Sequence, residues 1–466
     1  MKRYYIFLLM NFLMLNICFS NAAEKKNMHF YQLSSKQGLS HSTVISITQD
    51  KHDIMWFATF DGLNRFDGYS FRVYRNERKN EHSFMHDVLR TLFIDSEGVL
   101  WIGNMGGLSR YVAEKDHFNN YLCPAKGTRT PEVNALLEFD NSHLLVGTET
   151  GLKVFDKKKE QFVEMQQLTT LNSQVQSLAR QNNNYLIGTV DGLYVYNSIR
   201  KYLSPVHKAF DGKIIQAILP QSDSRIWVGT EGAGLFLLNL ITGEVKNFRH
   251  NPSNPNSLSS NYIRSLAFDA QFNLWIGTFN ALSIMSNGED KFSNYYHNPM
   301  QESSISQNSI RSIYMDTQGG MWLGSYYGGI NYYHPLKNKF EHIQQNPYTR
   351  SLNDKVISCI VEDEDGKIWI GANDMGINIY NPKNGGFDYV TRANTPTLTS
   401  NNIKTFLLSK DKKNIYVGTH GGGLLLLNKQ NRQATRIQGG SGTKINDVYA
   451  LTYDDTGKIW IGTLSG

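Results

Sequence analysis

Six polar side chains occupy one repeated position along this chain, and their chemistry suits the binding of hydroxyls and anions. Each follows the first apolar residue of a short alternating segment, as Arg264 follows Ile263. The six are Arg90, Asn134, Gln176, Gln216, Arg264 and Arg311. A guanidinium presents a planar fork of N–H donors, and an amide offers donors and an acceptor. If the segments converge, these groups predict a polar ring that binds the hydroxyls or acidic groups of a ligand. A hydrated rim without a ligand is the alternative.

A second candidate group lies in loops that vary more than the segments around them. Its members are Asn104, Phe279, Asn280, Tyr326 and Tyr327. Exposed aromatic rings provide apolar platforms with a polar tip, so we expect the two tyrosines to be the strongest candidates. Packing between loops is the alternative role, because the chain has 25 tyrosines.

Both candidate groups occupy fixed positions within a sequence repeat. A phrase of the form Trp-Ile-Gly-Thr recurs ten times, at intervals of 41 to 48 residues. Its glycine or the stand-in falls at Ala58, Gly103, Gly147, Gly188, Gly229, Gly277, Gly324, Gly371, Gly418 and Gly462. Such a period, with several short strands per unit, is typical of β-propeller blades. We therefore predict an all-β fold, a β-propeller in which both candidate groups converge on one face.

The copy around Trp275 shows the strands expected in each blade. Residues 263–268 alternate between apolar and polar types, as in a half-buried innermost strand. Residues 274–278 are apolar and rich in strand formers, and 281–284 and 292–296 supply the third and outermost strands.

Two further features of the repeat predict structure rather than chemistry. Several copies carry Asp-x-x-Gly before the tryptophan, as in Asp95–Gly98, Asp316–Gly319 and Asp454–Gly457. Aspartate can bind its own backbone and glycine tolerates a positive φ, so these are turns and not catalytic carboxylates. The glycine of the main phrase is expected to let neighbouring blades approach closely.

The first residues predict export. Residues 1–22 contain Lys2 and Arg3, an apolar run, and a small-x-small site at 20–22, as in a secretory signal peptide. No later segment approaches the length of a membrane span. The sequence therefore predicts an exported protein.

Cysteine usage and charge exclude other classes. After residue 22 only Cys123 and Cys359 remain, which predicts small core residues and leaves a single bridge as the alternative. The net charge of +6 over 466 residues comes without a basic run, so no nucleic-acid contact is expected.

The ten copies are expected to divide into one complete seven-bladed ring and a partial second propeller. Residues 29–33 read as a lone outer strand that can complete the seventh blade, whose other strands lie within 310–333. We therefore assign 23–335 to the first ring and 336–466 to the first three to four blades of a second, opened by 340–343. A single ten-bladed ring is the alternative.

The final copy predicts an interrupted unit. Gly466 follows soon after Trp460, where every other copy still has two strands to come. We expect either a fragment of a longer protein or an interrupted gene. The partial propeller would leave an open edge and an exposed blade face, so it should be the less stable part.

The first copy resembles the two-component regulator propeller repeat. The shared residues are Gly38, Leu39, Ser40, Val44, Ile47, Asp50, Trp56, Phe57, Thr59, Gly62, Leu63, Arg65 and Phe66. The resemblance extends over nearly the whole chain after residue 22. It implies two seven-bladed propellers in the periplasmic sensor region of a Bacteroidetes hybrid histidine kinase, followed by an immunoglobulin-like domain, a membrane helix, kinase domains and a DNA-binding regulator.

This chain departs from the family by ending at its tenth repeat, without the signalling parts. The resemblance implies an oligosaccharide ligand released from complex glycans, and a homodimer in the full-length parent. The resemblance supplies no set of ligand-binding residues that the family shares. The candidate residues named above are therefore chosen by their position in the repeat alone.

An enzymatic role is the remaining alternative, because some propellers are hydrolases or lyases. The sequence has no His-Glu-x-x-His metal motif and no Gly-x-Ser-x-Gly elbow. We therefore predict no catalytic residue, no metal site and no cofactor. A protein-interaction platform is the first alternative function, and a streptogramin-lyase-like enzyme is the second.

Overall fold

The computed structural model describes residues 28–125, 130–336, 343–346, 350–439 and 445–464, and these form two compact units, Met1–Lys339 and Phe340–Gly466. The described residues contain 38 β-strands and two short 3-10 helices, η1 (Ser35–Gln37) and η2 (Lys208–Phe210). The all-β prediction is confirmed. The predicted signal peptide and most of the 340–343 strand lie outside the described residues.

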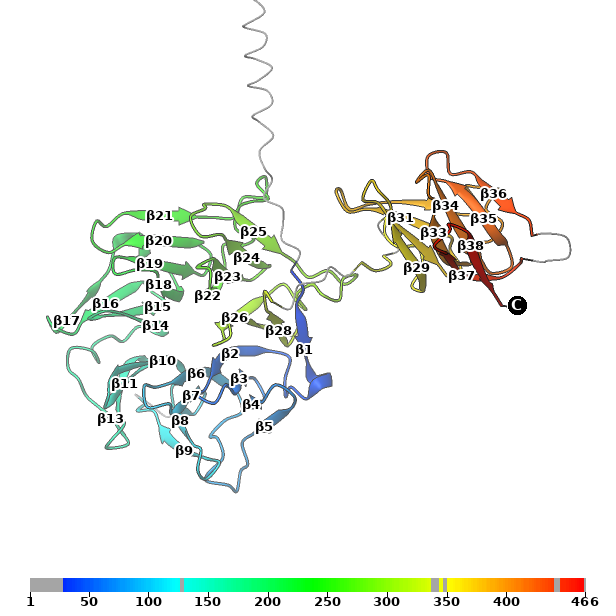
Figure 1. The fold of residues 1–466 in the computed structure, drawn as a ribbon. Coiled ribbons are helices and arrows are strands. Elements are labelled where there is room, and N and C mark those ends of the chain that lie inside the picture. The colour runs from blue at the N-terminus through cyan, green and yellow to red at the C-terminus, as the bar shows by residue number, and fades with distance from the viewer. Residues whose placement is uncertain (1–27, 126–129, 337–342, 347–349, 440–444, 465–466) are drawn as a thin grey trace, which may run out of the picture. The chain divides into compact units, whose positions relative to one another are not determined.

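The first unit consists of seven four-stranded antiparallel sheets that follow one another around a ring (Figure 1). The innermost strands are β2 (Val44–Gln49), β6 (Leu89–Ile94), β10 (Val133–Asp140), β14 (Val175–Gln181), β18 (Ile215–Pro220), β22 (Ile263–Phe268) and β26 (Ile310–Met315). The second strands are β3 (Met55–Thr59), β7 (Leu100–Asn104), β11 (His143–Thr148), β15 (Asn184–Thr189), β19 (Arg225–Thr230), β23 (Leu274–Thr278) and β27 (Met321–Ser325).

The outer half of each sheet completes the blade. The third strands are β4 (Gly62–Phe66), β8 (Gly107–Val112), β12 (Gly151–Asp156), β16 (Leu193–Asn197), β20 (Leu235–Asn239), β24 (Leu282–Met285) and β28 (Ile330–Tyr333). The outermost strands are β5 (Phe71–Tyr74), β9 (His117–Leu122), β13 (Gln161–Val163), β17 (Tyr202–Pro205), β21 (Val245–Phe248), β25 (Phe292–Tyr295) and β1 (Tyr31–Leu33).

The N-terminal strand closes the ring. β1 pairs antiparallel with β28, so that Tyr31 lies opposite Tyr332 and Leu33 opposite Ile330. Phe30, 4% exposed, packs in the core between the last two blades, and its N–H donates to the carbonyl of Ser303 at 2.8 Å. The predicted completion of the seventh blade is confirmed, although the strand begins at Tyr31 rather than at residue 29.

Repeated glycines set the spacing between blades, as predicted. A Cβ built on Gly147 would lie 2.5 Å from Cγ1 of Val175, the opening residue of the next innermost strand. The same relationship closes the ring, where a Cβ on Gly324 would lie 2.8 Å from Cγ1 of Val44. Real side chains do not approach so closely, so a larger residue at either position would force the neighbouring strand to shift.

The aspartates ahead of the tryptophans hold turns and indoles together. Oδ1 of Asp316 accepts the N–H groups of Gln318 and Gly320, and its Oδ2 accepts the indole N–H of Trp322 at 2.8 Å. The same aspartate–tryptophan bond joins Asp50 to Trp56, Asp95 to Trp101, Asp269 to Trp275, Asp363 to Trp369 and Asp454 to Trp460. The structural prediction for these aspartates is confirmed.

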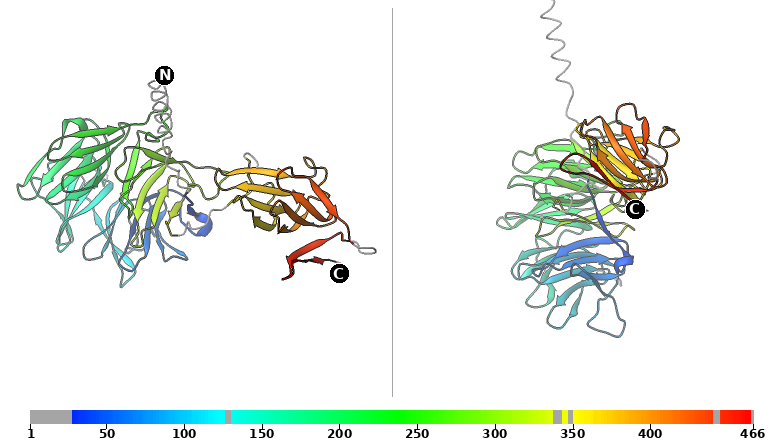
Figure 2. Two further views of the ribbon diagram at one scale, coloured as in Figure 1. Left: turned by 45° about the horizontal axis from the view of Figure 1, so that its top comes forward. Right: turned by 45° about the vertical axis from the view of Figure 1, so that its right-hand side comes forward.

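The described residues of the second unit form two four-stranded sheets and one hairpin, shown from two further directions in Figure 2. The strands of the sheets are β29 (Ile357–Glu362), β30 (Ile368–Ala372), β31 (Ile377–Asn381), β32 (Gly386–Val390), β33 (Ile403–Leu408), β34 (Asn414–Thr419), β35 (Gly423–Asn428) and β36 (Ala434–Ile437). The hairpin consists of β37 (Val448–Tyr453) and β38 (Ile459–Thr463).

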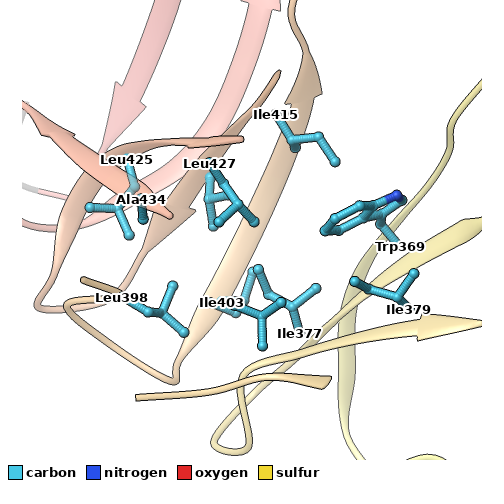
Figure 3. Packing of buried hydrophobic residues seen from close by; sticks show 11 residues of the cluster. Trp369, Ile377, Ile379, Leu398, Ile403, Ile415, Leu425, Leu427 and Ala434 are labelled. Atoms are coloured by element: carbon cyan, nitrogen blue, oxygen red, sulfur yellow. The ribbon is translucent and has the colours of Figure 1, made fainter. Parts of the chain in front are cut away.

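In the described part of the second unit, a side chain is buried where a neighbouring sheet covers it and exposed where none does. Trp369 is 2% exposed, because it lies against Ile403, Ile415 and their neighbours from the following sheet (Figure 3). Trp460, at the same repeat position in the hairpin, is 65% exposed. Ile360 on β29 is 64% exposed. The predicted exposed blade faces are therefore present, while their lower stability stays a prediction.

The two cysteines are free thiols. Cys123 is buried in the first unit, and Cys359 is half-buried on β29 of the second. Burial raises the pKa of each thiol to about 12, so both are protonated at neutral pH. The bridge alternative is wrong, and the small-core-residue prediction is confirmed for Cys123.

Candidate ligand-binding site

Every innermost strand of the seven-bladed unit has a β-bulge at the same place. The register with the second strand shifts between the opening apolar residue and the residue two places on, as between Ile263 and Ser265. The skipped residues, which we call the bulge ring, are Ile45, Arg90, Asn134, Gln176, Gln216, Arg264 and Arg311. A bulge leaves its extra residue out of the ladder and re-aims its side chain. The predicted alignment of the six polar positions is confirmed; their contact with a ligand stays a prediction.

The candidate loops lie at the same end of the blades as the bulge ring. The N–H of Phe279 donates to the carbonyl of Tyr262 at 3.0 Å, one residue before β22 begins. In the seventh blade the N–H of Tyr326 donates to Ser309 at 3.0 Å, one residue before β26. These bonds hold the residue that follows each second strand beside the start of the innermost strand. The two predicted groups therefore meet.

Each arginine of the bulge ring lies over an aromatic ring. The pairs are Arg90 with Phe60 at 5.9 Å, Arg264 with Phe279 at 5.4 Å and Arg311 with Tyr326 at 5.7 Å, measured from Cζ to the ring centroid. These separations are within the range of cation–π attraction. The aromatic face holds each guanidinium without using its N–H donors.

The three arginines differ in their counter-charges. Arg90 forms an ion pair with Glu132, with Nη2 2.9 Å from Oε2. Within the part of the chain that the structure describes, Arg264 and Arg311 form no ion pair, and the buried Nε of Arg264 has no hydrogen-bond partner. Two guanidinium groups thus retain free donors and uncompensated charge.

The pKa of Arg311 reflects this environment. Burial, together with the positive charges of Arg264 and Arg90, lowers this pKa to about 10, while Tyr326 and Glu231 act in the opposite direction. A charged neighbour shifts a pKa only when it is close, so the three guanidinium groups act on a common region. This region favours an anion.

The amides of the bulge ring mostly bind within the protein. Gln216 donates from Nε2 to Oε2 of Glu231 at 2.8 Å, and Asn134 donates from Nδ2 to the carbonyl of Val175 at 3.2 Å. Gln176 is half-buried. Among the described residues, donors without a partner therefore remain on Gln176 and on the arginines of the sixth and seventh blades.

Aromatic rings form two contacting groups beside these arginines. Phe279 is 55% exposed, Tyr327 62% and Tyr262 49%. We define the aromatic arc by its contacts: Tyr262 with Phe279, Tyr326 with Tyr327, Tyr327 with His41 and His41 with Phe60. Sequence reasoning missed three members, Tyr262, His41 and Phe60. Phe60 follows Thr59 just as Phe279 follows Thr278, and this signal could have identified it.

Two loop candidates have different placements. Asn104 is fully buried; its Oδ1 accepts the N–H of Gly106 at 2.7 Å and its Nδ2 donates to Ser109 at 3.1 Å. It takes the place of the turn-forming threonine of other blades, such as Thr278, and cannot reach a ligand. Asn280 is exposed, and its backbone N–H donates to Thr278 at 3.1 Å. We therefore correct the candidate set by removing Asn104.

Three segments of the chain match the family described as the two component regulator propeller, at residues 257–280, 304–327 and 351–374. The chain carries two-component regulator propeller repeats. Two of these repeats contain Phe279 and Tyr326, and a third lies in the second unit. The predicted family resemblance is confirmed.

Relatives of these repeats belong to signalling proteins. Histidine kinase P4 of Formosa agariphila is 42% identical over 67 residues, which cover 14% of this chain and 5% of that protein. The extracellular domain of the hybrid two component system BT3049 from B. thetaiotaomicron is 27% identical, with a TM-score of 0.72 over 94% of this chain. This chain covers 58% of that domain.

A more distant structure shares the fold alone. Virginiamycin B lyase from Staphylococcus aureus is 13% identical with a TM-score of 0.50, and the match covers 66% of this chain and 98% of the lyase. Among the described residues, no group of three or more His, Cys, Asp or Glu side chains could hold a metal ion. In the same part of the chain, no helix is long and apolar enough to cross a membrane.

Proposed function

We propose that this chain is the periplasmic ligand-sensing region of a hybrid two-component sensor histidine kinase, and that its ligand is an oligosaccharide derived from a glycan. The regulator propeller repeats and the similarity to the extracellular domain of BT3049 support the sensing role. In this proposal the chain itself binds and does not catalyse. A homodimer of the full-length parent, with kinase domains outside this chain, transmits the signal.

The observation that carries the proposal is the end of the seven-bladed ring, where Arg264 lies over Phe279, Arg311 lies over Tyr326, and the neighbouring Tyr327 is exposed. Guanidinium groups donate to several oxygens at once, and exposed rings cover the apolar faces of sugars. A ligand produces a signal only if it binds one arrangement of the receptor more tightly than another. The loops of this end are the elements that such a ligand would hold.

Calorimetric titration with a panel of neutral and acidic oligosaccharides tests the proposal. Binding that is lost in Arg264→Ala or Tyr326→Ala supports the sensor and the proposed face. A folded sample that binds none of the sugars but captures a protein partner would instead support the interaction platform.

A further inference from the structure

The charges around the bulge ring are unbalanced on one side. Arg90 forms an ion pair with Glu132, and Glu231 already accepts a hydrogen bond from Gln216. Arg264 and Arg311, on adjacent blades, have no carboxylate partner among the described residues. A buried or half-buried guanidinium is costly to leave unpaired, so this side of the ring is suited to receive an external anion.

The aromatic arc contains a residue in a strained conformation. Tyr327 has a φ of +72°, a region that bulky side chains rarely adopt. The loops of equal length in two other blades have Gly232 and Gly421 at this position, with φ of +97° and +75°. The loop of equal length that contains Asp374 does not adopt a positive φ there, so the loop length alone does not require this conformation. Tyr327 adopts it all the same, and backbone strain of this kind clusters at functional sites.

From these two observations, and resting on the proposed function, we infer that the ligand is an anionic oligosaccharide. Its acid groups bind the guanidinium groups of Arg264 and Arg311, and its sugar rings lie on Phe279 and Tyr327. Carboxylates of uronic acids and sulfate esters share the required chemistry, because both present paired oxygens to a guanidinium fork.

Three sugars of equal length separate charge from shape. They are a galacturonic acid tetramer, its neutral methyl ester, and a galactose tetramer that carries sulfates. The purified chain should bind at least one of the acidic tetramers more than tenfold more tightly than the ester, with an affinity that falls as salt is raised. The acidic tetramer with the higher affinity identifies the acid group.

Two variants test the residues. Arg264→Gln should weaken binding of the acidic tetramer more than tenfold and binding of the ester by less, whereas Arg200→Gln, at an exposed cation on the fourth blade, should change neither. Tyr327→Gly should raise the melting temperature and still weaken binding. A tyrosine that serves only to pack loops would instead lower the melting temperature when removed.

The outcomes are distinguishable. Equal affinity for the acidic tetramers and the ester would overturn the anionic inference and leave the sensing proposal intact. No binding of any acidic or neutral sugar by a folded sample would overturn both. Normal binding of the acidic tetramers by both Arg264→Gln and Tyr327→Gly would overturn the placement of the ligand.

Discussion

Trp227 buries its indole N–H without a hydrogen-bond partner among the described residues, because Gln221 stands six residues ahead of it where an aspartate is needed. The other six tryptophans of the repeat each donate to an aspartate at that spacing, at 2.8 to 3.1 Å. The turn itself is retained, since the N–H of Gln221 donates to the carbonyl of Arg225 at 2.9 Å. The fifth blade thus has the turn but not the carboxylate.

Gln221→Asp should stabilise the first unit. The carboxylate would accept the buried indole N–H and the N–H groups of the turn, which predicts a gain of about 1–2 kcal/mol in the free energy of unfolding. Chemical denaturation of the variant and of the parent measures the difference. Gln221→Asn supplies no second oxygen, so it should raise the free energy of unfolding by less. An equal gain in both variants would show that the hydrogen bond to the indole is not the source of the added stability.

Removing one oxygen from an existing pair should have the opposite effect. Asp316→Asn places an amide N–H donor against the indole N–H of the buried Trp322. This variant should lower the free energy of unfolding by about 2–3 kcal/mol. Asp454→Asn makes the same change beside Trp460, which is 65% exposed, and should cost less than about 0.5 kcal/mol. Denaturant titration of both variants is the test, and similar costs would contradict the role of burial.

Ring closure by the N-terminal segment should depend on Phe30. Phe30→Ala removes a ring that packs on Tyr333 with a centroid distance of 5.9 Å, and should cost about 3–4 kcal/mol. Tyr69→Ala, at a side chain that is 96% exposed, is the control and should change stability by less than about 0.5 kcal/mol. If Phe30→Ala has the same free energy of unfolding as the control variant, the N-terminal segment does not stabilise the closed ring.

Arg311 should destabilise the ligand-free protein. Burial lowers its pKa in the fold to about 10, below the ordinary value of arginine, so the fold disfavours the charged form. This cost is fully present below pH 10 and disappears as the pH rises through the ordinary pKa of arginine. Arg311→Met should therefore raise the free energy of unfolding at pH 8, by an amount on the order of 1–3 kcal/mol.

The advantage of Arg311→Met over the parent should shrink when denaturation is repeated above pH 10. An advantage that is independent of pH, or a loss of stability at pH 8, would contradict the account of the repelling arginines.

The repeat made most of the fold predictable, because its period and its glycines report directly on blade spacing. Gly324 and Val44 are 280 residues apart in sequence, yet the same phrase predicted their approach. The six polar positions were also predictable, because each follows a fixed apolar residue. Asn104 was misjudged, since sequence shows a loop position but not that a side chain turns inward to replace a threonine. Tyr262 and His41 were missed, because their contacts join segments that the repeat pattern does not compare.

The strain at Tyr327 could not be read from the sequence alone. Its loop differs from the others in composition, but only the φ of +72° shows that tyrosine occupies a glycine conformation. The imbalance of charge likewise depends on which carboxylates already have partners, and pairs such as Arg90 with Glu132 join different blades.

Binding of an oligosaccharide at the bulge ring is tested most directly by hydrogen–deuterium exchange of the purified chain, with and without a saturating galacturonic acid tetramer. The account predicts slower exchange in peptides that span 258–282 and 305–330, with no change in the outer turn at 286–291. Binding that protects only other segments, or leaves 258–282 and 305–330 unchanged, would contradict it.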